Sequence, residues 1–387
     1  MASYRIMFVL TPRFHHNEGG VQMTTYKLSK WLAQAGHDVG VFSFVMEGHV
    51  KSEFAHVFLP EDGSGLSNDR NLDALTRALD QFRPDVVINQ MPYEHRIGVT
   101  LRKFSPPLLL GCLRNTLFSV KNNLDGFASQ VLPKSVAPFF QNPLGRAWLL
   151  SYHRKRHRRN LEKILSTYDY FVMFAPQNLD ELGFFMPGFD RNKIKLIPNS
   201  IPSVLDQVPK KEKRLLWLGR LSVHQKRADL ILPLWEKVQP LLPGWEFDVV
   251  GDGPALDDLK RAISARSIKG VTLHGRQQPE EFFLRSPIYV MTSAFEGFPN
   301  TVIEAQSFGA VPVLFNSFPV AEFIVTDGVN GFLVEPFDLE MMALRIVETV
   351  QAAERSNISV RVLESARRFE IDAVGEMWQQ LFDDCLR

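Results

Sequence analysis

The order of apolar runs along the chain is the sequence feature that most constrains its fold. Residues 4–10 form a mostly apolar run, a polar loop follows, and apolar side chains then recur at helical spacing from 21 to 35. An apolar run of this kind is typical of a strand buried on both faces of a parallel sheet. Because the same order of strand, loop and helix recurs, the sequence predicts an α/β fold with helices on both faces of parallel sheets.

This order of strands and helices runs through the chain twice, which indicates two domains. The first series ends with a strand expected at residues 170–175, and a second series begins at residues 214–218. The 387 residues also exceed what one hydrophobic core usually covers. We therefore predict Rossmann-like domains at 1–197 and 198–370, and a helix at 371–387 that packs back on the first. Such sheets bind ligands at the carboxyl ends of their strands, so we expect the site in the cleft between the domains.

Composition excludes several classes of protein. The formal net charge of +1 gives no global electrostatic basis for binding nucleic acid. Only two cysteines occur, Cys112 and Cys385, so we expect no disulfide framework and a reducing compartment, the cytoplasm. No apolar run approaches the roughly 20 residues that a membrane-spanning helix needs. We predict a soluble or peripheral protein, and its oligomeric state stays open.

A run of basic residues at 153–159 admits two interpretations. It reads His-Arg-Lys-Arg-His-Arg-Arg, and Lys121, Arg146 and Trp148 precede it. The first interpretation is a solvated face of a helix. The second is contact with anionic lipid headgroups or a phosphorylated acceptor, which would bring the protein to the inner face of the membrane.

The segment 293–305 carries the strongest indication of function. Glu296 is expected on a loop after a strand, and Glu304 lies inside the following helix with seven residues between them. The start of this helix, at 300–302, favours a negatively charged diphosphate. A carboxylate inside the helix can accept hydrogen bonds from ribose hydroxyls, and one on the loop can hold the hydroxyls of a sugar. The segment therefore suits a nucleotide sugar.

The spacing of the two glutamates resembles the E-x7-E signature of the retaining glycosyltransferases of family 4, which have the GT-B fold. Other segments resemble elements of that family in the same order. These are Gly19-Gly20-Val21, Pro198-Asn199-Ser200-Ile201, Gly219-Arg220-Leu221 with Lys226, Gly251-Asp252-Gly253-Pro254 and His274-Gly275-Arg276. The resemblance covers nearly the whole chain and implies two Rossmann-like domains that face each other across a cleft.

The resemblance also implies roles for individual residues. Arg220 and Lys226 would stabilise the charge on the departing diphosphate, and Glu296 would hold the hydroxyls of the transferred sugar. These three are the expected catalytic residues. The expected donor-binding residues are Gly19, Gly20, Asn199, Gly251, Gly275, Arg276, Gly297, Phe298, Asn300, Thr301, Val302 and Glu304. Because two cations and a helix terminus would supply the positive charge, the resemblance implies no metal and no other cofactor.

One position departs from the family pattern. Many members carry a histidine after the fourth N-terminal strand, facing the donor sugar, and Arg114 takes that place here. A register error, a different sugar contact or a weakened activity would each account for this. His95 is an alternative partner for the sugar, and Asn115 is a further candidate for contact with acceptor or sugar.

The sequence thus predicts a retaining glycosyltransferase. It would move a hexose from a nucleotide-diphosphate sugar, with a UDP-sugar favoured, to a glycan or glycolipid acceptor in the synthesis of surface polysaccharide or lipopolysaccharide. Two alternatives stay open at this point. One is a degenerate GT-B protein that binds a partner without catalysis, and the other is a nicotinamide-dependent oxidoreductase, although no Gly-x-Gly-x-x-Gly loop follows a strand. The sequence leaves the sugar, the nucleotide base and the acceptor undetermined.

Overall fold

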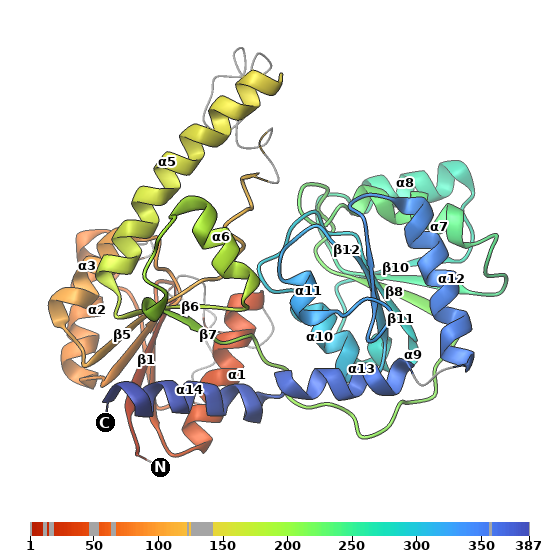
Figure 1. Cartoon of the computed structure of the whole chain (residues 1–387). Helices are drawn as coiled ribbons and strands as arrows, with labels where there is room; N and C mark the ends of the chain where they lie inside the picture. Colours follow the sequence, from red (N-terminus) through yellow and green to blue (C-terminus); the bar gives the residue numbers. More distant parts are fainter. Residues whose placement is uncertain are drawn as a thin grey trace. The chain divides into compact units, whose positions relative to one another are not determined.

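The computed structural model describes residues 2–10, 14, 19–45, 54–62, 67–121, 124, 142–355 and 358–386. The chain forms two compact units (Figure 1). The first unit comprises Met1–Ser200 and Ile371–Arg387, and the second comprises Ile201–Glu370. The boundary falls three residues beyond the expected one at 197. The second unit begins at Ile201 because this residue forms a β-bridge with Glu370, and its N–H donates to the carbonyl of Phe369.

The first unit is built on a parallel sheet of seven strands. Their order is β3 (His56–Phe58), β2 (Asp38–Ser43), β1 (Arg5–Leu10), β4 (Val86–Asn89), β5 (Leu108–Cys112), β6 (Tyr170–Met173) and β7 (Ile194–Leu196). All but the first residue of β1 are fully buried, as expected for a central strand between two helical layers. The strand order reverses between β1 and β4, and the carboxyl ends at such a point form a crevice for ligands.

Helices cover both faces of this first sheet (Figure 1). They are α1 (Gly20–Gln34), α2 (Asp69–Phe82), α3 (His95–Phe104), α5 (Pro143–Thr167), α6 (Gln177–Phe185) and the C-terminal α14 (Ile371–Leu386), with a short 3-10 turn, η3 (Arg191–Lys193). Two helix starts are fixed by asparagine caps. Asn68 accepts from the N–H of Asn71 at 2.8 Å, and Asn142 accepts from the N–H of Gly145 at 2.9 Å.

The last helix, α14, packs on α1 and β5 of the first unit. Trp31 of α1 donates through Nε1 to Asp372 at 2.7 Å. Gly375 allows the two helices to approach closely, because a Cβ there would lie 2.4 Å from the Trp31 ring. Met377 of this helix is 39% exposed, whereas Trp378 is buried.

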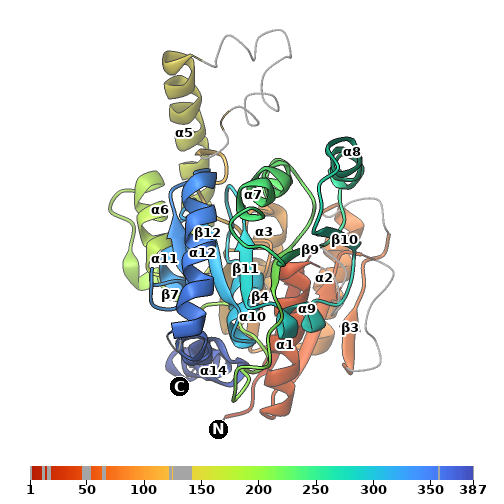
Figure 2. The ribbon, with the colours of Figure 1, turned by 90° about the vertical axis from the view of Figure 1, so that its right-hand side faces the viewer.

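The second unit is built on a parallel sheet of six strands. Their order is β10 (Val271–Gly275), β9 (Glu246–Val250), β8 (Arg214–Leu218), β11 (Ile288–Met291), β12 (Val311–Phe315) and β13 (Phe332–Val334). Its helical elements are η4 (Ala228–Leu230), α7 (Ile231–Val238), α8 (Leu256–Arg266), α9 (Glu280–Arg285), α10 (Asn300–Ser307), α11 (Ala321–Ile324), α12 (Leu339–Arg355), α13 (Ile358–Ala366) and η5 (Arg367–Phe369). Figure 2 shows α7 and α12 side by side, and the contacts between them agree.

Both units match the predicted class, two Rossmann-like folds with parallel sheets. Pro233 lies at the third position of α7. Its missing N–H is harmless there because the first turn of a helix has no internal acceptors for its N–H groups. No helix in the described part of the chain is long and apolar enough to cross a bilayer.

Candidate functional site

The loop after β8 and the loop after β9 lie against each other at the carboxyl edge of the second sheet. The N–H of Gly219 donates to the carbonyl of Val250 at 3.0 Å, and the N–H of Leu221 donates to the main-chain carbonyl of Asp252 at 2.9 Å. A Cβ at Gly251, where φ is +141°, would lie 1.8 Å from the Gly219 oxygen. Glycine is therefore required for this contact, and the role that the structure gives Gly251 is to bring the two loops together.

An ion pair joins the loop after β8 to the loop after β11. Lys226 Nζ lies 2.7 Å from Glu296 Oε1, and these side chains are only 16% and 8% exposed. Gln225 adds an N–H···O bond to Glu296 Oε2 at 3.3 Å. The main chain joins the same loops, because Ala294 N–H donates to the Gln225 carbonyl at 2.7 Å. Two predicted catalytic residues thus lie in direct contact.

The Lys226 loop is anchored to the end of β11 by two buried side chains. Trp217 Nε1 donates to Thr292 Oγ1 at 2.9 Å, and this hydroxyl donates to the carbonyl of Lys226 at 2.8 Å. Trp217 is 2% exposed and Thr292 is fully buried. Core packing therefore fixes the main chain of Lys226.

Arg220 differs from Lys226 because its side chain is exposed. Among the residues that the structure describes, no carboxylate pairs with its guanidinium. It directly follows Gly219, which hydrogen-bonds to Val250 just after the end of β8. The same edge of the sheet therefore carries one cation already paired with a carboxylate and one whose charge faces solvent.

Helix α10 begins at this edge and is tied to the sheet by a buried tyrosine. The Tyr289 hydroxyl donates to Thr301 Oγ1 at 2.7 Å, and it lies 3.3 Å from the Leu218 carbonyl. Burial raises the pKa of Tyr289, and the negative charges of Glu296 and Glu304 add to this effect. The hydroxyl therefore stays protonated and keeps its donor role, while both glutamates lie near enough to influence it.

The other predicted residues of segment 293–305 lie either in the core or at the surface where α10 begins. Gly297, Phe298 and Val302 are buried, and Val302 N–H donates to the Pro299 carbonyl at 2.9 Å. Asn300 and Glu304 are partly exposed. Side-chain contact with a ligand is thus open to Asn300 and Glu304, whereas Val302 packs into the core.

The predicted residues at the end of β10 lie beside the same stacked loops. Gly275 accepts from the N–H of Gly251 at 2.8 Å and has a φ of +66°, and Arg276 after it is exposed. The preceding His274 points elsewhere. Its Nε2 lies 2.7 Å from the fully buried Asp248.

In the first unit, Gly19 and Gly20 stand at the start of α1. Gly19 caps the helix with a φ of +48°, and its carbonyl accepts from the N–H of Met23 at 3.2 Å. A Cβ at Gly19 would lie 2.5 Å from the side-chain oxygen of Gln22. Conformation alone therefore accounts for glycine at this position.

Arg114 and Asn199 meet in the first unit, whereas His95 lies apart from them. Arg114 donates through Nε to Gln90 Oε1 and through Nη1 to Asn199 Oδ1, the latter at 3.4 Å. His95 is an exposed residue at the start of α3 and lines another cavity together with Tyr168. The exposed Asn115 uses its side-chain oxygen to accept from the N–H of Thr116 at 2.8 Å.

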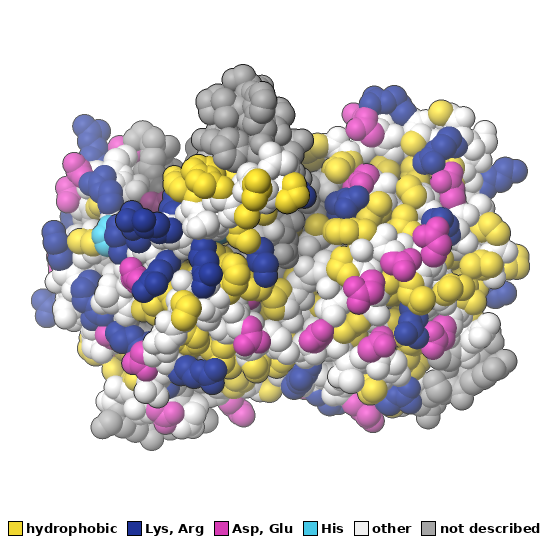
Figure 3. Space-filling model, turned by 45° about the horizontal axis from the view of Figure 1, so that its top comes forward, with side chains coloured by type: hydrophobic (Ala, Val, Ile, Leu, Met, Phe, Trp, Pro, Cys, Tyr) yellow, Lys and Arg dark blue, Asp and Glu magenta, His cyan; other side chains and the backbone are white. Residues whose placement is uncertain are grey.

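The basic run 153–159 is not one uniform charged face of α5. His153 and His157 point inward, with ring centroids 5.5 and 4.6 Å from that of Phe185. Burial lowers the pKa of both histidines to about 4, so they are uncharged at neutral pH. The remaining residues of the run are exposed: Arg154, Lys155, Arg156, Arg158 and Arg159. On the face shown in Figure 3, Lys and Arg side chains gather beside hydrophobic ones.

Four residues of these sites were missed from the sequence: Gln90, Gln225, Tyr289 and Thr292. Tyr289 and Thr292 sit in or directly after an apolar strand, where the pattern indicates only core packing. Gln225 adjoins Lys226, and that adjacency was the one available signal. Within the described ranges, no three His, Cys, Asp or Glu side chains converge as metal ligands would. The expectation that no metal is needed stays a prediction.

Comparison with known families matches each unit to one family model. Residues 18–203 match the model described as Glycosyltransferase Family 4, and residues 206–360 match Glycosyl transferases group 1. The GDP-mannose:cellobiosyl-diphosphopolyprenol alpha-mannosyltransferase of Komagataeibacter xylinus is 30% identical over 45% of this chain and 46% of its own length. The chain spans between 21% and 52% of the length of three further curated relatives that it matches.

Solved structures share the fold over nearly the whole chain. The lipopolysaccharide outer core galactosyltransferase WaaB gives a TM-score of 0.71 at 16% identity, covering 98% of this chain and 99% of its own. HepE of Anabaena, solved with UDP and glucose, gives 0.71 at 14% identity, covering 98% of this chain and 100% of its own. Likeness at this level of identity identifies the fold, and the two family models carry the assignment of family.

The ion pair between Lys226 and Glu296 should stabilise the second unit. Lys226→Met leaves a buried carboxylate without its cation, so we expect a loss of about 3–5 kcal/mol in the free energy of unfolding. Lys226→Met combined with Glu296→Gln should recover more than half of that loss. Lys237→Met is the matched control, because its partner Glu340 is 72% exposed, and it should cost far less than Lys226→Met.

Urea unfolding followed by tryptophan fluorescence measures these differences. If the double variant is no more stable than Lys226→Met, the two side chains do not depend on each other and the pair contributes nothing to stability.

Proposed function

We propose that this chain, which belongs to the glycosyltransferases of group 1 and family 4, moves a hexose from a nucleotide-diphosphate sugar to a glycan or glycolipid acceptor with retention at the anomeric carbon. The observation that carries the proposal is the cluster at the carboxyl edge of the second sheet. There Lys226 pairs with Glu296, Arg220 is exposed, and the helix bearing Glu304 begins.

The ion pair suggests how the donor is received. Glu296 neutralises Lys226, with 2.7 Å between Nζ and Oε1. A diphosphate that approaches this edge competes with Glu296 for the ammonium group, and Arg220 adds a second cation. Once Lys226 turns to the phosphate, the carboxylate of Glu296 becomes available to accept hydrogen bonds from sugar hydroxyls. Glu304, partly exposed in α10, would accept from the ribose hydroxyls.

The chemical step would then depend on stabilising the leaving group. As the bond from the anomeric carbon to the phosphate oxygen breaks, negative charge grows on the diphosphate, and Arg220 and Lys226 oppose it. In the front-side reaction that we propose, the acceptor oxygen attacks from the side that the diphosphate leaves, and the departing phosphate oxygen takes the acceptor proton. No carboxylate acts as nucleophile, and the two cations supply the charge for which other enzymes use a metal.

The choice of donor and acceptor follows from proteins of the same fold. HepE was solved with UDP and glucose, which favours a UDP-sugar, whereas the name of the Komagataeibacter relative gives GDP-mannose as its donor. The names of that relative and of WaaB refer to a diphosphopolyprenol and to lipopolysaccharide. We therefore propose a cytoplasmic enzyme of surface polysaccharide or glycolipid synthesis. The family match does not favour an oxidoreductase or a non-catalytic binding protein.

Removing either cation should slow turnover. Arg220→Ala and Lys226→Ala should each lower the rate of nucleotide release from a UDP-sugar by at least about tenfold, or ~1.4 kcal/mol in barrier. Glu304→Ala should weaken donor binding with little change in the thermal midpoint. Lys237→Ala is the control, since it removes a partly exposed cation of the same unit that pairs with Glu340. Near-normal turnover in both cation variants would remove these residues from the diphosphate role.

The surface of α5 favours an acceptor presented at a membrane. Leu144, Trp148 and Tyr152 are 84%, 53% and 44% exposed, and the rings of Trp148 and Tyr152 stack 5.8 Å apart. Lys155 and Arg159 continue the same face of the helix at spacings of three and four residues. An apolar and aromatic stripe followed by cations is typical of a helix at the boundary of an anionic bilayer. We propose that this face of α5 contacts anionic lipid.

Sedimentation with vesicles tests this contact. The full chain should bind vesicles that contain phosphatidylglycerol and not vesicles of phosphatidylcholine alone. Trp148→Ala and the pair Lys155→Gln with Arg159→Gln should each weaken binding by about tenfold. Leu241→Ala, an exposed apolar residue of the second unit, should leave binding unchanged. Equal binding by all these variants would contradict a role for this face.

A further inference from the structure

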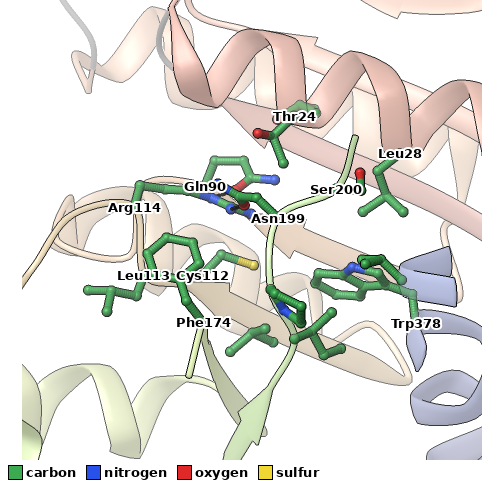
Figure 4. A pocket seen from close by; sticks show the side chains of 15 residues that line it. Thr24, Leu28, Gln90, Cys112, Leu113, Arg114, Phe174, Asn199, Ser200 and Trp378 are labelled. Atoms are coloured by element: carbon green, nitrogen blue, oxygen red, sulfur yellow. Dashed lines mark hydrogen bonds between the residues drawn. The ribbon is translucent and has the colours of Figure 1, made fainter. Parts of the chain in front are cut away.

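A small pocket in the first unit is lined by hydrogen-bond donors and lacks any acid. It lies at the carboxyl ends of β4, β5, β6 and β7, with α1 and α14 closing its sides (Figure 4). The polar residues that line it are Thr24, Thr25, Gln90, Arg114, Asn199 and Ser200, together with Cys112. No aspartate or glutamate occurs among the described lining residues.

Arg114 brings a positive charge into this pocket, and no carboxylate of the described residues pairs with it. Its guanidinium donates to Gln90 Oε1 and, at 3.4 Å, to Asn199 Oδ1, and both acceptors are neutral amides. Nearby Cys112 offers no negative charge, because burial raises the pKa of its thiol. Burial likewise lowers the pKa of Arg114. A partly buried cation with no carboxylate beside it is costly, so the pocket is suited to accept a negative group.

Gln90 adds a donor that nothing in the pocket satisfies. Its side chain is 2% exposed, and its oxygen accepts from Arg114. Its amide nitrogen, Nε2, is buried and has no hydrogen-bond partner among the described residues. Figure 4 shows Gln90, Arg114 and Asn199 lying together in the pocket. A buried amide N–H left unpaired costs free energy, which an acceptor atom would recover.

We propose that this pocket binds one oxygen of a phosphate or carboxylate group carried by the acceptor. The ligand oxygen would accept from Gln90 Nε2 and from the guanidinium of Arg114. The enclosed space is about 10 Å³, enough for one water-sized atom, so the rest of the anionic group would lie at the mouth. Binding of an anion at this site does not depend on the proposed transfer reaction and can be measured without turnover. Only the assignment of the anion to the acceptor rests on that function.

Gln90→Glu provides a direct test, because it places a carboxylate of the same size beside Arg114. The substituted side chain would pair with the guanidinium and fill the role of the ligand. We expect the thermal midpoint of the ligand-free protein to rise, and its further rise with inorganic phosphate to disappear. In the unaltered chain, phosphate and acetate should each raise the midpoint.

Arg114→Gln covers the case in which Gln90→Glu fails to fold. We expect it to weaken phosphate binding by at least about tenfold in calorimetry. Lys103→Gln is the matched control, since it removes one exposed cation of the same unit and should leave phosphate binding unchanged.

Two further measurements identify which site binds the anion. Phosphate binding that persists with saturating UDP, and in Arg220→Ala, supports a site separate from the donor. Loss of phosphate binding in Arg220→Ala with retention in Arg114→Gln would overturn the proposal, because the anion would then belong to the second unit. Competition between UDP and phosphate at Arg114 would also overturn it, since the pocket would then take the diphosphate of the donor.

Discussion

The contact between Lys226 and Glu296 joins the elements on which the candidate site depends. A lysine and a glutamate that are 16% and 8% exposed can be charged only because each compensates the other. Their pairing fixes the loop after β8 against the loop after β11, and Trp217 and Thr292 hold the same loop from the core. The positions of the cation and of the carboxylate are thereby set before any ligand arrives. In the reaction that we propose, a diphosphate would compete with Glu296 for Lys226 because it carries more negative charge than one carboxylate.

The two units use charge in opposite ways at the carboxyl edges of their sheets. In the second unit the partly buried cation has its carboxylate within the protein. In the part of the first unit that the structure describes, Arg114 donates to the neutral side chains of Gln90 and Asn199. The cost of removing a charge from water is offset in the second unit by the partner carboxylate, and in the first unit the anion that we propose would offset it.

The sequence predicted the two units and most of their strands because apolar runs and glycine positions are local signals. The strand at Arg214–Leu218 was predicted without error, and the helix expected to start at 300–302 begins at Asn300. Contacts between distant segments could not be predicted in this way. The pairing of Lys226 with Glu296 spans 70 residues, and the orphan amide of Gln90 depends on packing around it. His153 and His157 point inward because they pack against Phe185 on another helix. The run of basic residues in the sequence does not indicate this contact.

The most direct test of the central claim is calorimetric titration of the full chain with UDP, GDP and ADP in buffer containing EDTA. The account predicts that one of these nucleotides binds without a metal, and that its binding weakens when Arg220 or Glu304 is replaced by alanine. If no nucleotide diphosphate binds, or if binding is unchanged in both variants, the cluster around Lys226 and Glu296 is not a donor site and the proposed transfer reaction is wrong.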